Sequence, residues 1–299
     1  MRINPIVKKD LQVSARSMRL AWGLFGYEAI LTIAFLLAMM VIREESRSLY
    51  GSGNIYNSMV YLFPVIGISQ LCIIALITPI ITASSISGEK ERQTFDVMLT
   101  TAMSPFSIVF GKVTSAVVRI MFYVLGSLPI MALSFIVGGL GWSTLFLYLL
   151  TVLLLAVFSG SIGIFCSSIC RKSITAVILS FVFYFVVYGM TFLPLLLRFI
   201  LGYSDAGESL LALLWNPGAF FEEYFMITMT GESLISTEML RKDDVGAITY
   251  WFMERNIWVY VSAGCILVLT ILFMLMAAWK VNPMHSSGGR KPGKKKKEN

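Results

Sequence analysis

Four long runs of this sequence contain no Asp, Glu, Lys or Arg. They cover residues 48–88, 120–170, 173–197 and 256–279, and are 41, 51, 25 and 24 residues long. A fifth stretch, between Arg19 and Arg43, contains a single charge, Glu28. A helix needs roughly 20 apolar residues to cross the hydrocarbon core of a bilayer, which is about 30 Å thick. The runs therefore exclude an ordinary soluble enzyme and predict a chain that crosses the membrane several times.

The charge-free runs divide into six expected spans. The longest run is too long for one helix, and Gly138, Gly139 and Gly141 indicate a turn inside it. Strands of a membrane barrel would be about 10 residues long and would alternate strictly in polarity, which these runs do not. We therefore expect an all-α polytopic membrane protein with spans near residues 22–42, 59–83, 113–137, 143–167, 174–200 and 257–279.

The distribution of Lys and Arg predicts the orientation, because cytoplasmic loops are enriched in both. With the N-terminus inside, 18 of the 24 Lys and Arg residues lie on the inner side, where the net charge is +13 against −5 outside. Both termini are therefore expected in the cytoplasm. The expected organisation is an amphipathic interfacial helix over 1–21, a membrane domain over 22–279 with an outer segment at 201–256, and a basic tail over 280–299.

The residues that could carry chemistry are few. His285 is the single histidine, so no Ser/His/Asp or Cys/His set is available. Cys166 and Cys170 lie one helical turn apart but have no third ligand near in sequence. Residues 288–295 approach a phosphate-binding loop, but the pattern fails at Lys295, where a hydroxyl is required. We expect no catalytic residue, no metal, no cofactor bound by this chain, and no nucleic-acid partner, because topology explains the basic charge.

The segment 87–104 joins the second and third spans and combines charge with an apolar face. Glu89, Lys90, Glu91 and Arg92 form a dense charged cluster. The apolar residues after it recur at i, i+3, i+4 and i+7, which predicts one face of a short amphipathic helix: Phe95, Met98, Leu99 and Ala102. Such a helix either lies on lipid or docks in a partner's groove. Ser104 followed by Pro105 predicts the start of the next helix.

Residues 88–101 read Gly-Glu-Lys-Glu-Arg-Gln-Thr-Phe-Asp-Val-Met-Leu-Thr-Thr. This stretch resembles the signature of the ABC type-2 permease family, roughly G-E-[KR]-E-x-G-T-[LF]-[ED]-x-L-L-x-T-P. Gly111 and Lys112 are similar to the "L-G-K" that precedes the family's third span. Gln93 replaces a glycine and is expected to stiffen the helix. Ala102 replaces a proline and is expected to lengthen it.

The resemblance implies the membrane subunit of an ABC exporter in a prokaryotic cell membrane. It implies a second permease copy or paralogue, two separate ATP-binding subunits that use the ATP, and contact with membrane lipid. The 87–104 helix would couple to the ATP-binding subunit. The coupling residues would be Glu89, Glu91, Arg92, Thr94, Phe95, Asp96, Met98 and Leu99. From the residues alone, a non-ABC secondary carrier or a membrane-embedded scaffold remains an alternative.

Two charges lie inside expected spans, Glu28 and Arg119. Intramembrane charges are candidates for function. From the sequence, the two residues could pair with each other, extend to the interface, or handle cargo or protons. The 1–21 helix likewise could be a simple membrane anchor or could contact the ATP-binding subunit.

The later spans contain two packing features. Ser159, Gly160 and Gly163 allow another helix to approach closely, and we expect that contact within the subunit. Family resemblance implies a re-entrant helical piece before the last span, which we place near residues 210–214 and 220–229.

Overall fold

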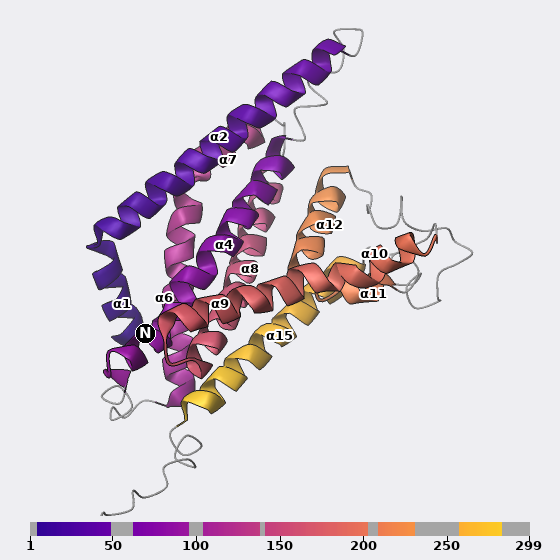
Figure 1. Cartoon of the computed structure of the whole chain (residues 1–299). Helices are drawn as coiled ribbons and strands as arrows, with labels where there is room; N and C mark the ends of the chain where they lie inside the picture. Colours follow the sequence, from indigo (N-terminus) through magenta and orange to yellow (C-terminus); the bar gives the residue numbers. More distant parts are fainter. Residues whose placement is uncertain are drawn as a thin grey trace, which may run out of the picture.

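The computed structural model describes residues 5–48, 62–95, 104–137, 141–202, 209–230 and 257–282. Within these residues every regular element is helical and no strand occurs (Figure 1). Six helices are long and apolar enough to cross a membrane, which confirms the predicted all-α, six-span architecture. They are Leu20–Glu44, Leu62–Glu91, Pro105–Gly126, Trp142–Ile169, Ser173–Ile200 and Ile257–Val281.

The N-terminal arm is two helices rather than one. Helix α1 (Pro5–Ala15) ends before Ser17, and α2 (Met18–Ser48) begins directly after it. Serine is favoured at helix N-termini, and the Ser17 carbonyl accepts a hydrogen bond from Leu20 N–H at 3.1 Å. The expected 1–21 helix is therefore interrupted, and Met18 and Trp22 lie exposed on α2.

Helix α4 (Leu62–Glu91) is longer than a bilayer core requires. Its 30 residues correspond to about 45 Å at 1.5 Å per residue, against about 30 Å of hydrocarbon. One end of α4 must therefore project beyond the bilayer. Helix α6 (Pro105–Gly126) then begins as predicted, with Ser104 as N-cap accepting from Ser107 N–H at 3.3 Å and Pro105 in the first turn.

The third span is shorter than predicted and begins earlier. The expected helix over 113–137 is interrupted at Ser127, after which α7 (Leu128–Val137) follows. Pro129 has no N–H to donate to the carbonyl four residues before it. The Ser127 hydroxyl donates to the Val124 carbonyl at 2.9 Å and so satisfies a group at the break.

The fifth span is also interrupted. Helix α9 (Ser173–Tyr184) passes into a five-residue π-helical segment η1 (Phe185–Gly189), a 3-10 turn η2 (Met190–Phe192) and α10 (Leu193–Ile200). The side-chain amide of buried Asn216 donates to the Tyr188 carbonyl at 3.0 Å and to the Thr191 hydroxyl at 2.6 Å. The irregular backbone inside the span is thus stabilised from outside the helix.

The segment before the last span folds back onto the bundle. Helix α11 (Leu210–Leu213) and α12 (Pro217–Thr230) precede α15 (Ile257–Val281). Helix α12 buries Phe221 and Phe225 against the bundle, and it packs beside α8 and α15 (Figure 1). A Cβ added at Gly67 of α4 would lie 2.8 Å from the Phe225 ring, so α12 approaches α4 very closely.

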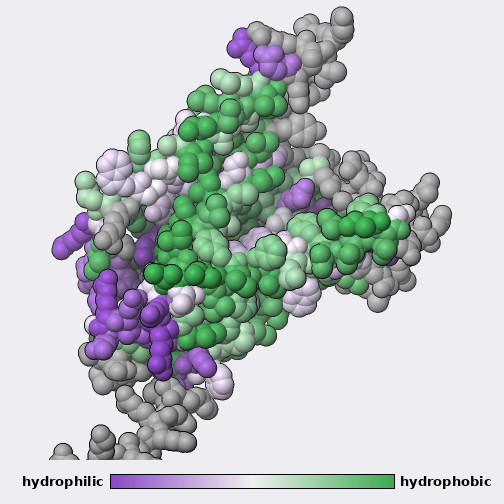
Figure 2. All heavy atoms as spheres, viewed as in Figure 1, coloured by the Kyte–Doolittle hydropathy of each residue, from purple (hydrophilic) through white to green (hydrophobic). Residues whose placement is uncertain are grey.

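Helix α8 (Trp142–Ile169) is the central helix of the bundle, in contact with α4, α6, α9 and α15. Most hydrophilic side chains on the face shown gather at one end of the bundle, with a smaller group at the far end of α2, and the long helices between are largely hydrophobic (Figure 2). We call the first of these ends the basic end. Its exposed cationic residues are Lys8, Lys9, Arg16, Arg92, Arg171, Lys172 and Lys280.

Candidate functional site

Helix α4 ends at the basic end in a specific hydrogen-bonded turn. Gln93 has a positive φ of 59°, Gln93 N–H donates to the Lys90 carbonyl at 3.2 Å, and Thr94 N–H donates to the Glu89 carbonyl at 3.0 Å. This is the pattern of a Schellman cap, whose left-handed residue is usually glycine. The prediction that Gln93 stiffens one continuous 87–104 helix is therefore wrong, because Gln93 terminates α4.

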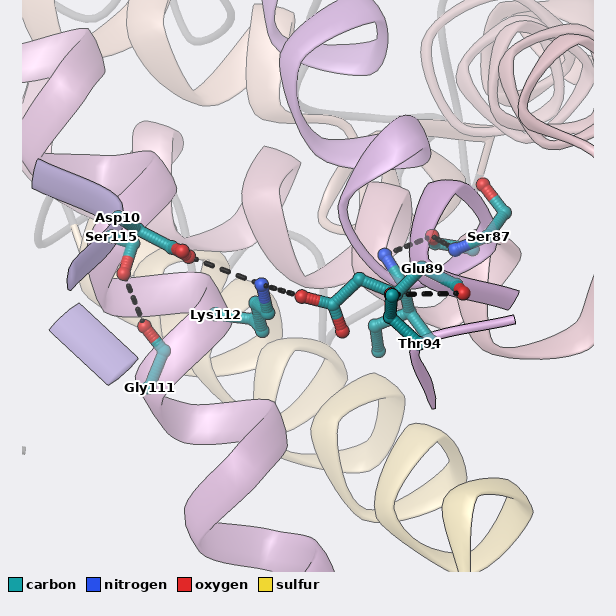
Figure 3. Close-up of polar contacts among 9 residues, drawn as sticks. Asp10, Ser87, Glu89, Thr94, Gly111, Lys112 and Ser115 are labelled. Atoms are coloured by element: carbon teal, nitrogen blue, oxygen red, sulfur yellow. Dashed lines mark hydrogen bonds and ion pairs between the residues drawn. The ribbon is translucent and has the colours of Figure 1, made fainter. Parts of the chain in front are cut away.

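The first three charges of the predicted cluster point back toward other helices. Glu89 Oε1 lies 2.7 Å from Lys112 Nζ of α6, and the same ammonium lies 3.2 Å from Asp10 Oδ2 of α1 (Figure 3). Lys112 is only 4% exposed. A buried cation is costly unless it is paired, and the two half-buried carboxylates meet that need. One lysine thus connects α1, α4 and α6.

Lys90 and Glu91 reach two further helix ends. Lys90 Nζ donates to the Ser168 carbonyl in the last turn of α8, where a cation is favourable. Glu91 Oε2 accepts hydrogen bonds from both the N–H (3.1 Å) and the hydroxyl (2.9 Å) of Ser173, the first residue of α9. The side chain of Lys172 provides no cap there, so Glu91 acts as the acidic cap of α9 from a neighbouring helix.

A buried serine strengthens the same junction one turn earlier. Ser167 Oγ of α8 accepts the backbone N–H groups of Ile86 at 2.9 Å and Ser87 at 2.8 Å. The last turn of α4 is therefore held by direct polar contacts to α6, α8 and α9, and Lys112 of α6 links it to Asp10 of α1. We call this set of residues the clamp: Asp10, Glu89, Lys90, Glu91, Lys112, Ser167, Ser168 and Ser173.

The remaining predicted coupling residues lie outside the clamp. Arg92 and Thr94 are exposed. Phe95 is half-buried, packs against the buried cluster around Val113 and Ile164, and lies with its ring centre 5.4 Å from Lys90 Nζ. It therefore faces its own bundle. Asp96, Met98 and Leu99 fall outside the described residues.

Sequence reasoning missed the partners that complete the clamp: Asp10, Ser167, Ser168, Ser173 and the pairing role of Lys112. A signal did exist for Lys112, since it is the one charge in the apolar stretch 97–118 and a buried charge requires a partner. No comparable signal marks the three serines.

This architecture can be compared with known families. A family model described as ABC-2 type transporter matches residues 7–203, which is well over half of the chain and includes the whole clamp. The chain belongs to the ABC-2 type transporter family. No curated protein matches it significantly. As a member of this family with six apolar helices, the chain is a multi-pass membrane subunit of an ABC transporter.

In this ABC-2 type transporter the two intramembrane charges do not pair within the described residues. Glu28 lies over Gly126, where an added Cβ would be 2.8 Å from its Oε1. Arg119 is seven residues earlier on α6, about 10 Å away along the axis, and its Nε donates to the Ser115 carbonyl at 3.4 Å. Of the three roles left open by the sequence, mutual pairing is therefore excluded in this structure.

The small residues of span four pack within the transporter subunit, as predicted. A Cβ added at Gly163 of α8 would lie 1.7 Å from Thr82 Oγ1 of α4, and one at Gly160 would lie 3.9 Å from Val113 and Val117 of α6. Gly163 thus permits the close approach of α4 and α8 that brings Ser167 to the end of α4.

Proposed function

We propose that this chain is the permease subunit of an ABC exporter and that a separate ATP-binding subunit docks at the basic end. The observation that carries the proposal is the clamp. The signature segment leaves α4 at the residues that contact α6, α8 and α9 directly, and that reach α1 through Lys112. A partner pushing on residues 92–104 would therefore act on five helices at once.

The orientation follows from the same arrangement. The exposed Lys and Arg residues of the basic end fit a cytoplasmic surface, which is where an ATP-driven partner must bind. Under this proposal Glu89, Lys90 and Glu91 transmit force within the permease. Arg92, Thr94 and the segment beginning at Asp96 are left to contact the partner directly.

The proposed cycle assigns no bond-breaking step to this chain. Closure of two ATP-binding subunits on ATP would press the segments after α4 of two permease copies. The rigid junction would tilt the helix ends together, and the pathway would open outward. A secondary carrier would instead need its own ion-coupled groups in the membrane, and Glu28 alone is a weak candidate for that role.

Co-expression with the ATP-binding subunit tests the proposal. Arg92→Glu should lower co-purification and ATP hydrolysis by the complex at least about tenfold, because reversing a close interface charge costs several kcal/mol. Arg43→Glu, an equal reversal of an exposed arginine near the far end of α2, is the matched control and should change neither quantity. Unchanged values for Arg92→Glu, in monodisperse protein, would contradict docking at this segment.

A further inference from the structure

The outer face of α1 forms a shallow basic hollow of about 320 Å³, lined by Lys8, Lys9, Gln12, Val13 and Arg16. These positions recur at i, i+1, i+4, i+5 and i+8, which places them on one side of the helix. No carboxylate is among the lining residues. The hollow therefore offers three cations and an amide to a ligand, which is the chemistry of an anion site.

The chain that follows this hollow enters the first span with an exposed apolar surface. Met18, Trp22 and Phe25 are 74%, 70% and 66% exposed at the start of α2. The rings of Trp22 and Phe25 contact edge to face at 6.0 Å. Tryptophan is enriched at the membrane–water interface. An anion that carries acyl chains matches both surfaces, whereas a free phosphate would use only the first.

The opposite face of α1 belongs to the clamp. Asp10 reaches Lys112, and Val7 is buried with 7% of its surface exposed. Helix α1 packs on α6 through this face. A ligand that holds the outer face at the membrane surface would therefore also hold Asp10 beside Lys112.

We propose that the hollow on α1 binds the headgroup phosphate of an anionic phospholipid, and that its occupancy stabilises the clamp through Asp10. The second half rests on the function proposed above, whereas the binding site does not. Basic pockets at the cytoplasmic ends of spans bind anionic headgroups, each cation near the surface contributing a similar share of the attraction.

Lipid quenching tests the binding site without any ATP-binding subunit. The full chain is reconstituted in phosphatidylcholine vesicles with a minority of phosphatidylglycerol, and bromine is placed on the chains of one lipid or the other. The fluorescence of Trp22 is obtained by subtracting the fluorescence of the Trp22→Phe variant from that of the natural chain. We expect brominated phosphatidylglycerol to quench Trp22 more strongly than brominated phosphatidylcholine does. This preference for phosphatidylglycerol should fall about fivefold for each cation lost when Lys8→Gln, Lys9→Gln and Arg16→Gln are introduced in turn.

In the control variant, three cations of the tail, Lys294, Lys295 and Lys296, are replaced by glutamine. This lowers the net charge by the same amount as the triple α1 variant and should keep the preference for phosphatidylglycerol. Equal quenching by both lipids, no quenching by either, an equal loss in the tail variant, or displacement by inorganic phosphate would each overturn the site. If the triple α1 variant does not fold, Lys9→Gln alone should still lower the preference.

The link to the clamp is tested in the complex with the ATP-binding subunit. Phosphatidylglycerol should stimulate ATP hydrolysis severalfold in the natural chain. Asp10→Asn should abolish this stimulation while retaining the Trp22 quenching preference. If the quenching preference holds but Asp10→Asn leaves the stimulation unchanged, the link through Asp10 is wrong. If the permease has no effect on ATP hydrolysis while the Trp22 quenching preference is intact, the result would count against the proposed function and not against the lipid site.

Discussion

The two ends of α4 are held by different kinds of interaction. At the basic end, ion pairs and hydrogen bonds join its last turn directly to α6, α8 and α9, and to α1 through Lys112. Near its other end aromatic packing dominates, and one buried hydrogen bond, from the Tyr148 hydroxyl to Gln70 Oε1 at 2.7 Å, accompanies it. Phe63 meets Tyr148 and Phe225 at ring-centre distances of 5.4 Å each, and Phe225 fills the space over Gly67.

The difference separates two mechanical tasks. Ion pairs and hydrogen bonds require defined distances and angles, so under the proposed function the clamp would fix the direction in which the helix ends move together. Aromatic side chains contribute large buried areas, so the α12 end resists separation of the helices. We infer that force enters where contacts are directional and is resisted where packing is dense.

Gly163→Val should have the largest effect, because it separates α4 from α8 between these two ends. The new side chain would overlap Thr82, and severe overpacking of this kind costs about 3 kcal/mol or more of unfolding free energy. Gly264→Val is the matched control, since no atom lies within 4 Å of its added Cβ. Unfolding of both variants in detergent measures the difference, and equal losses would contradict the close α4–α8 contact.

Lys112→Met and Phe225→Ala distinguish the two ends of α4 directly. Each should lower the unfolding free energy by about 3 kcal/mol, the first by leaving two carboxylates unpaired and the second by opening a cavity. ATP hydrolysis per folded complex should fall only in Lys112→Met. A similar fall in Phe225→Ala would show that coupling is not confined to the clamp.

Glu91→Ala should have a smaller effect. Loss of the acidic cap on α9 is expected to lower the unfolding free energy measurably, as for other helix caps. Glu222→Ala removes an exposed carboxylate from α12 and should change stability by less than about 0.5 kcal/mol. Equal stabilities of the two variants would show that the hydrogen bonds to Ser173 contribute nothing.

Gln93→Gly should have the smallest effect, and it should stabilise the protein. Glycine adopts a positive φ without strain, and the gain should be about 0.5–1 kcal/mol after its greater unfolded-state entropy is included. The same exchange at Gln12, inside α1, should destabilise by up to about 1 kcal/mol. A loss of stability in Gln93→Gly would contradict the Schellman cap.

The sequence predicts the spans well because the cost of burying charge in lipid acts residue by residue. It also predicts the Ser104 cap, because a cap depends on residues that are neighbours in sequence. The break after Tyr184 is stabilised by Asn216, which is far along the chain, so the sequence does not predict it. The break at Ser127 has a local cause, Pro129, and was missed although the proline is visible in the sequence.

The clamp shows the same division between features that depend on neighbours in sequence and features that depend on distant residues. The charged residues from Glu89 to Arg92 are conspicuous in the sequence, but their partners lie far along the chain. Glu91 contacts Ser173, 82 residues away. The resemblance implied that these charges face a partner protein, whereas the packing of α4 brings Glu89, Lys90 and Glu91 into contact with α6, α8 and α9 of the same chain.

A double-mutant cycle on Glu89 and Lys112 tests the clamp most directly. Unfolding free energies are measured for Glu89→Gln, Lys112→Met, the double variant and the natural chain. If the ion pair holds α4 to α6, the sum of the two single-variant losses should exceed the loss in the double variant by at least about 1 kcal/mol, within the range of directly interacting pairs. Losses that add to within about 0.5 kcal/mol would show that Glu89 and Lys112 act independently, and would contradict the clamp.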